Sequence, residues 1–186
     1  MKPSTKTVLT FGVISGCLSS LMMLLTVPFL DRIGFDYGEY LGYTAIVASF
    51  LPIYFGIRAY RDNVAGGTLT FGRGFLVGLM IAVISSLFYV ATWEVVYFKL
   101  VPDFAAKYTA HAVDHMKRTG ATQEKIDETM RQMQMLKQYL DNPLTNAAMT
   151  LVEPLPIGVL IALISAGVLR RSRDRISAAA TDLPSR

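Results

Sequence analysis

The fold of this chain is decided by residues 74–98, which read GFLVGLMIAVISSLFYVATWEVVYF and carry one charged residue, Glu94. A helix needs about 20 predominantly apolar residues to cross the hydrocarbon core of a bilayer. Backbone N–H and C=O groups find no water there, so a crossing segment must bond them internally as a helix. The stretch therefore predicts a membrane-spanning helix.

Three further runs have the same character and cover residues 8–30, 40–57 and 149–169. The chain is therefore expected to cross a membrane four times, with a bend at Pro52 inside the second crossing. The overall composition agrees, because 52% of the 186 residues are hydrophobic and 17% are charged. We expect one four-span domain over residues 1–175, followed by a disordered tail, residues 176–186, which is small and polar.

Basic residues flank these runs on alternate sides. They precede the first run, follow the fourth and fill the second connection, whereas the first connection, residues 31–39, is acidic. The basic residues include Lys2, Lys6, Arg58, Arg61, Arg73, Arg170 and Arg171. Lys and Arg near span ends favour the cytoplasm. We therefore expect a multi-pass protein of the bacterial inner (cytoplasmic) membrane with both termini cytoplasmic. The net charge of +4 reflects orientation signals and not a nucleic-acid surface.

The one sizeable polar segment covers residues 99–147, between the third and fourth runs. It predicts two helices, the first ending at Gly120 and the second capped by Thr122. The chain is thus expected to be an all-α integral membrane four-helix bundle. An extracytoplasmic helical hairpin would lie between the third and fourth spans.

An apolar row follows one face of the second hairpin helix and consists of Ile126, Met130, Met133 and Leu136. Exposed apolar surface is costly in water, so the row must be covered. It would pack against the first hairpin helix or the membrane surface, or it would form an adaptable docking face for a partner.

Small residues recur at four-residue spacing within the spans. Gly74, Gly78 and Ala82 share one face of the third run, and Gly158 and Ala162 share one face of the fourth. In lipid such faces allow helix backbones to approach closely. Packing within one chain and dimerisation are both consistent with this pattern.

Two acidic residues, Glu94 and Glu153, lie nearest the hydrocarbon, on the expected ends of neighbouring spans. Ionisable groups at this depth are costly and often mark ion or substrate paths. The two residues form either a solvated helix end or a shared polar site. Within the four runs no charged residue lies at mid-span, which argues against a proton-coupled pump.

Other site chemistry is weakly represented. His111 and His115 are one helical turn apart, a spacing that can share a metal, but no third ligand accompanies them. Residues 67–74 read GTLTFGRG, which resembles a phosphate-binding loop without its lysine. We expect no metal, no cofactor and no enzymatic activity, since no nucleophile–base set is visible.

Residues 56–79 read GIRAYRDNVAGGTLTFGRGFLVGL, and Pro156-Ile157-Gly158 opens the last run. This pattern resembles the bacterial membrane family named "domain of unknown function 4199". The resemblance extends over about residues 8–175. It implies four spans, a glycine-rich basic hairpin and a polar segment before the last span. It implies no activity and no functional residue.

Two classes of function follow. The first is a non-enzymatic membrane protein that serves in assembly or docks a partner, either another membrane protein or a second copy of itself. The second is a small oligomeric transporter or channel that uses the region of Glu94 and Glu153. Contact with the lipid bilayer is common to both.

Overall fold

The structure, a computed structural model, describes residues 2–170. The expected tail at residues 176–186 and the arginines that follow Arg170 lie outside the described residues. In chain order, the helices are α1 (Pro3–Thr26), η1 (Val27–Phe29), α2 (Leu30–Ile33), α3 (Phe35–Ser49), α4 (Leu51–Asn63), α5 (Phe71–Val95), η2 (Val96–Leu100), α6 (Phe104–Arg118), α7 (Gln123–Leu140), α8 (Pro143–Leu151) and α9 (Pro154–Leu169).

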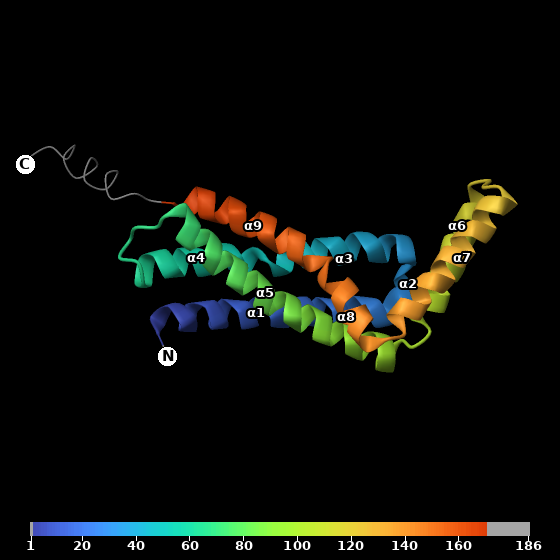
Figure 1. The fold of residues 1–186 in the computed structure, drawn as a ribbon, viewed down its shortest axis with the longest axis horizontal. Coiled ribbons are helices and arrows are strands. Elements are labelled where there is room, and N and C mark those ends of the chain that lie inside the picture. Colours follow the sequence, from blue (N-terminus) through green and yellow to red (C-terminus); the bar gives the residue numbers. More distant parts are fainter. Residues whose placement is uncertain (1, 171–186) are drawn as a thin grey trace, which may run out of the picture.

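Four helical segments are long and apolar enough to cross a membrane, namely Ser4–Ile33, Phe35–Asn63, Phe71–Leu100 and Pro143–Leu169. They lie side by side, and the α6–α7 hairpin projects from one end of them (Figure 1). We call this the hairpin end, and the opposite end, where α1 begins and α9 ends, the terminal end. The predicted all-α membrane bundle, with a helical hairpin between the third and fourth spans, is confirmed.

The helices extend beyond the apolar runs. The expected connection at residues 31–39 is mostly helical, because Gly34 alone separates α2 from α3. Gly34 has φ +85°, a left-handed conformation that side-chain-bearing residues rarely adopt. The acidic residues of this region therefore lie on helices and not in a free loop. The fourth crossing likewise begins earlier than residue 149, at Pro143 in α8.

Prolines mark the breaks inside the crossings. Pro52 lies in the first turn of α4, and the second crossing is interrupted at Phe50, between α3 and α4. Pro154 opens α9 after a short turn that separates it from α8. A proline at the start of a helix costs little, because that N–H has no intrahelical partner.

The rows of small residues are covered within the chain, where α5 meets α9. A Cβ atom added to Gly78 would lie 2.8 Å from Cβ of Ala162, and one added to Gly158 would lie 2.8 Å from Cβ of Ala82. Gly74 similarly faces Ala166. Intramolecular packing therefore accounts for these two rows.

The first crossing packs on the other side of α5. Gly12 faces Ile84, and Gly16 faces Phe88. Between these helices, at mid-span, the Ser15 hydroxyl lies 2.9 Å from Oγ of Ser85 and also contacts the Ser49 carbonyl oxygen of α3. This buried polar contact joins three crossings at one level.

The hairpin forms as predicted from its turn residues. Gly120 has φ +75°, and the Thr122 side chain caps α7 by accepting a hydrogen bond from the Lys125 amide. Ile126 of α7 is 4% exposed. The two hairpin helices therefore pack as a pair.

Gly78→Leu should destabilise the bundle, because the new side chain would push against Ala162 and Ile57. Overpacking costs about 1–3 kcal/mol, and each kcal/mol lowers Tm by about 2–4 °C in a chain of this length. Thermal unfolding in detergent micelles measures the effect.

Gly72→Leu is the matched control, since a Cβ at Gly72 meets no atom within 4 Å. Equal melting temperatures for the two variants would contradict the close approach of α5 and α9.

Candidate functional site

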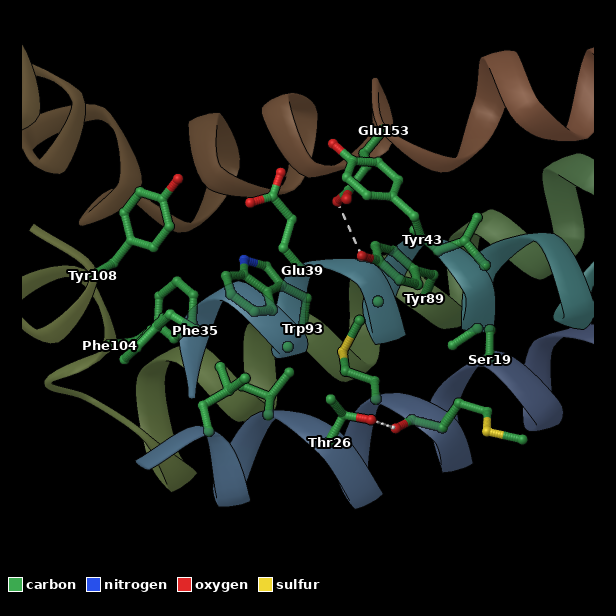
Figure 2. A pocket seen from close by; sticks show the side chains of 18 of the residues that line it. Ser19, Thr26, Phe35, Glu39, Tyr43, Tyr89, Trp93, Phe104, Tyr108 and Glu153 are labelled. Atoms are coloured by element: carbon green, nitrogen blue, oxygen red, sulfur yellow. Dashed lines mark hydrogen bonds between the residues drawn. The ribbon is translucent and has the colours of Figure 1, made fainter. Parts of the chain in front are cut away.

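A cavity of about 370 Å³ lies between the crossings at the hairpin end. Its walls come from α1, α2, α3 and α5, from the start of α9 and from both hairpin helices (Figure 2). Most of the lining is apolar. The lining residues are Ser19, Met22, Met23, Thr26, Val27, Leu30, Phe35, Gly38, Glu39, Gly42, Tyr43, Ala45, Ile46, Ser49, Tyr89, Trp93, Phe104, Tyr108, Leu136, Leu140 and Glu153.

Two glycines one turn apart shape the α3 wall. A Cβ atom at Gly42 would meet no other atom within 4 Å, so this position opens directly into free space. Gly38 instead lets Leu30 of α2 pack against the α3 backbone. Side chains at both positions would narrow the space between α3 and the rest of the bundle.

The cavity has buried residues at one end, its floor, and exposed residues at the other, its mouth. Met23, Ile46 and Ser49, deep in the crossings, are buried. Glu39 and Glu153, which also line the cavity, are exposed. Figure 2 shows Glu39, Tyr43 and Glu153 on one side of the cavity and Thr26 of α1 on the opposite side. The cavity therefore runs from an apolar interior to a polar, acidic rim.

A hydrogen bond between distant segments orders part of this rim. The Tyr89 hydroxyl of α5 donates to Oε2 of Glu153 over 2.9 Å. Within residues 2–170, the Glu39 carboxylate has no hydrogen bond or ion pair. Glu153 is therefore held by a fixed donor, whereas Glu39 is available to a ligand.

Aromatic rings attach the hairpin above the cavity. Phe104 of α6 stands edge-on to Trp93 with ring centroids 5.0 Å apart, and its ring stacks on Tyr108 at 6.2 Å. Phe35 at the start of α3 lies 6.3 Å from Phe104. Aromatic pairs in these geometries contribute about 0.5–1.5 kcal/mol each beyond their buried area. Two of these rings, Phe104 and Tyr108, cover the cavity from the hairpin side.

Ionic contacts tether α6 to the turn between the first two crossings. Nζ of Lys107 lies 2.6 Å from Asp31 and 3.1 Å from Asp103. These carboxylates, Asp31 first, raise the pKa of Lys107 above its ordinary value of 10.5. The stabilisation from this raised pKa is fully present below pH 10.5 and is lost only as the pH rises through the higher folded value. The tether is thus intact throughout the neutral range.

The two histidines have different surroundings. Nε2 of His111 lies 3.0 Å from Oδ1 of Asp36, and its ring stacks on Phe35 at 5.2 Å. His115, the other weak metal candidate, is exposed. Within residues 2–170, no group of three or more His, Cys, Asp or Glu side chains is placed to hold a metal ion. His111 therefore serves the attachment of the hairpin.

A buried asparagine connects the base of the hairpin to the bundle. Oδ1 of Asn146 accepts hydrogen bonds from Nε1 of Trp93 at 3.0 Å and from the Thr150 hydroxyl at 3.1 Å. Nδ2 of Asn146 donates to the Leu140 carbonyl oxygen at 2.8 Å. Asn146 is fully buried. It joins α5, the end of α7 and α8, and it orients Trp93 at the cavity wall.

The two acids expected to share a site have different positions. Glu153 lines the cavity, whereas Glu94 is not among the lining residues. Oε1 of Glu94 is buried and has no hydrogen-bond partner within the described part of the chain. The cavity thus uses one of the two acids, and it pairs Glu153 with Tyr89 and not with Glu94.

The four residues of the expected docking row differ in how far the chain covers them. Ile126 is buried within the hairpin, and Leu136 lines the cavity. Met133 is half-buried, while Met130 is 40% exposed. Two members of the row are therefore covered by the chain itself, and Met130 is left on the outside.

Several residues that line the cavity, Glu39 and Tyr43 among them, were not singled out from the sequence. Glu39 fell within the acidic connection at residues 31–39. The signal that could have found them is the pair Gly38 and Gly42, which places Glu39 and Tyr43 beside a helix face without side chains. Trp93 and Tyr89 carried no comparable signal.

The fold and the cavity define a multi-pass membrane protein whose crossings enclose a small-molecule-sized space. The chain belongs to the family described as "Protein of unknown function (DUF4199)", which matches residues 10–171. The resemblance seen in residues 56–79 is thereby confirmed. No curated protein and no solved structure matches the chain.

Asn146→Leu should loosen the base of the hairpin, because it leaves the Trp93 N–H and the Leu140 carbonyl without their partner. A buried polar group without a partner costs about 1–3 kcal/mol. We expect faster amide hydrogen exchange in α8 and the end of α7, measured in detergent micelles.

Gln138→Leu on the exposed side of α7 is the control and should leave exchange unchanged. Unaltered exchange in both variants would show that Asn146 does not hold the hairpin base.

Proposed function

We propose that this protein is a non-enzymatic membrane protein that binds an amphipathic molecule in the cavity beneath its hairpin. One observation carries the proposal. The cavity measures about 370 Å³, and small-molecule pockets typically measure about 300–1,000 Å³. It lies inside membrane-crossing helices and is open at a polar rim.

The gradient from floor to rim supports an amphipathic ligand. Met22, Met23 and Ile46 offer an apolar surface deep in the crossings. Glu39 and Glu153 stand at the exposed end. A molecule with a hydrocarbon tail would place its tail in the apolar interior and its polar head at the rim. Amphiphiles adopt the same orientation in a bilayer, with the tail in the hydrocarbon and the head at the surface.

The polar groups inside the cavity support binding over catalysis. The Ser19 hydroxyl donates to the Gly16 carbonyl oxygen, and the Ser49 hydroxyl donates to that of Ala45. Among the described residues that line the cavity there is no histidine, cysteine or lysine to act as nucleophile or base. We therefore propose that the cavity holds its ligand without converting it.

The hairpin suits the role of a cap that presents the occupied state to a partner. It covers the cavity with Phe104, Tyr108 and Leu136, while Met130 and Met135 remain exposed on α7. Such a surface could dock another membrane protein or a second copy of the chain.

The transporter alternative is favoured by one observation, that Glu153 lines the cavity. The buried floor at Ser49 favours a binding site over a passage.

We further propose that the terminal end faces the cytoplasm of a bacterial cell and that the hairpin lies on the far side of the inner membrane. Lys6, Arg58 and Arg73 belong to the terminal end, where α1 and α5 begin and α4 ends. Asp31, Asp36 and Glu39 belong to the hairpin end. Positive charges are retained on the cytoplasmic side during insertion.

A reporter active only outside the cytoplasm, fused at Lys125, should be active, because Lys125 lies in the exposed first turn of α7. The same reporter fused after Asn63, at the terminal end, is the control and should be silent. The reverse pattern would overturn this orientation.

Gly42→Phe should fill the cavity and weaken binding of a dansyl-labelled amphiphile about tenfold or more, since Gly42 opens into free space. The chain contains one tryptophan, and it is Trp93 at the cavity wall. Energy transfer from Trp93 therefore reports a dansyl group bound close to the cavity wall, and a loss of transfer in Gly42→Phe assigns that binding to the cavity.

Gly167→Phe is the matched control, because a Cβ at Gly167 of α9 also meets no atom within 4 Å. Equal, saturable energy transfer in both variants would mean that the amphiphile binds elsewhere.

A further inference from the structure

The charge at the mouth of the cavity points to one class of ligand. Among the described lining residues, the charged side chains are Glu39 and Glu153, and both are acids. We propose that the ligand is an amphiphile with a positively charged head, an ammonium group bound between Glu39 and the aromatic rim. This inference rests on the proposed binding function and names its ligand class.

Glu39 differs from four aspartates of the hairpin end, each of which has a basic partner. Asp31 and Asp103 contact Lys107, Asp36 contacts His111, and Asp141 contacts Lys137 at 2.6 Å. The side chain of Glu39 has no such partner among the described residues. Glu39 is exposed at the mouth of the cavity, so its carboxylate is free to meet the charged head of a bound amphiphile. The aspartates near Glu39 thus have basic partners from the chain itself, whereas the Glu39 carboxylate remains available to a ligand.

Glu153 contributes a second, oriented carboxylate. Its Oε2 accepts the Tyr89 hydroxyl, and this bond fixes the side chain at the rim. The remaining oxygen can accept a hydrogen bond from an ammonium N–H. Figure 2 shows Glu39 and Glu153 on the same side of the cavity, with Tyr43 beside Glu153.

The rings around the mouth suit a cation as well. Tyr43, Trp93 and Tyr108 line the cavity together with Phe35 and Phe104. A cation over an aromatic face gains about 0.5–2 kcal/mol, more when it is desolvated. Several rings with two carboxylates form the kind of enclosure that binds quaternary and primary ammonium groups.

The same geometry disfavours an anionic head. Two basic groups of the hairpin end, Lys107 and Lys137, are held by aspartates and do not line the cavity. An anion would meet Glu39 and Glu153 without any compensating charge. An amine-bearing membrane lipid and a cationic amphiphile from solution share the favoured chemistry.

The test uses the purified full-length chain in nanodiscs, with Trp93 fluorescence as the readout. Three probes with the same dodecyl tail are titrated: dodecyltrimethylammonium, dodecyl sulfate and an uncharged dodecyl ether of oligoethylene glycol. We expect saturable binding of the cation, at least about tenfold tighter than that of the uncharged probe. Glu39→Gln should weaken the cation about tenfold and leave the uncharged probe unchanged.

Glu124→Gln is the matched control, because Glu124 is exposed in the first turn of α7, away from the cavity. Equal affinities for all three probes, or no effect of Glu39→Gln, would overturn the charge preference while the binding function stands. If no probe gives a saturable signal that Gly42→Phe weakens, both the charge preference and the proposed binding function are overturned.

A competition experiment distinguishes a membrane lipid from a soluble amphiphile as the source of the ligand. Nanodiscs that contain phosphatidylethanolamine should compete with dodecyltrimethylammonium if the natural ligand is an amine-bearing lipid, whereas phosphatidylglycerol should not. Preserved binding of the cation in both kinds of nanodisc would identify a soluble amphiphile instead. Competition by phosphatidylglycerol alone would contradict the charge preference.

Discussion

The close approach of α5 to α9 is the contact on which the rest of the structure depends. Gly78 against Ala162 and Gly158 against Ala82 leave no side chain to hold the helices apart. In lipid, where burial of apolar surface gives little driving force, such packing is a main source of association. The same approach lets Tyr89 reach Glu153, so the order at the cavity rim follows from small residues deep in the bundle.

The hairpin end is organised by a different principle, the pairing of polar groups near the membrane surface. Lys107 and His111 contact aspartates at the turn between the first two crossings. Asn146 accepts a hydrogen bond from the Trp93 N–H and donates one to the Leu140 carbonyl oxygen at the end of α7. Two of these contacts involve the cavity wall, because His111 stacks on Phe35 and Asn146 bonds to Trp93. The hairpin is therefore part of the cavity wall and not an appendage to the four crossings.

Membership of the DUF4199 family describes the chain but assigns it no activity. The cavity supplies a physical starting point, because its walls are apolar and its mouth is acidic and aromatic. Glu39 has no ion-pair partner among the described residues, whereas Asp31, Asp36 and Asp141 each have one, and this contrast gives the ligand its expected charge. The sole tryptophan lies in the cavity wall, so binding can be measured without any label on the protein.

The sequence by itself determined the crossings and the hairpin, because both follow from local rules. A long uncharged run must be a helix in lipid, and Gly120 with Thr122 sets the hairpin turn wherever the segment lies. The cavity was decided only by the tertiary structure. It requires Gly42 to face open space and Glu153 to meet Tyr89, 64 residues away. Spacing along one helix reveals which residues share a face, but not what the facing helix places opposite them.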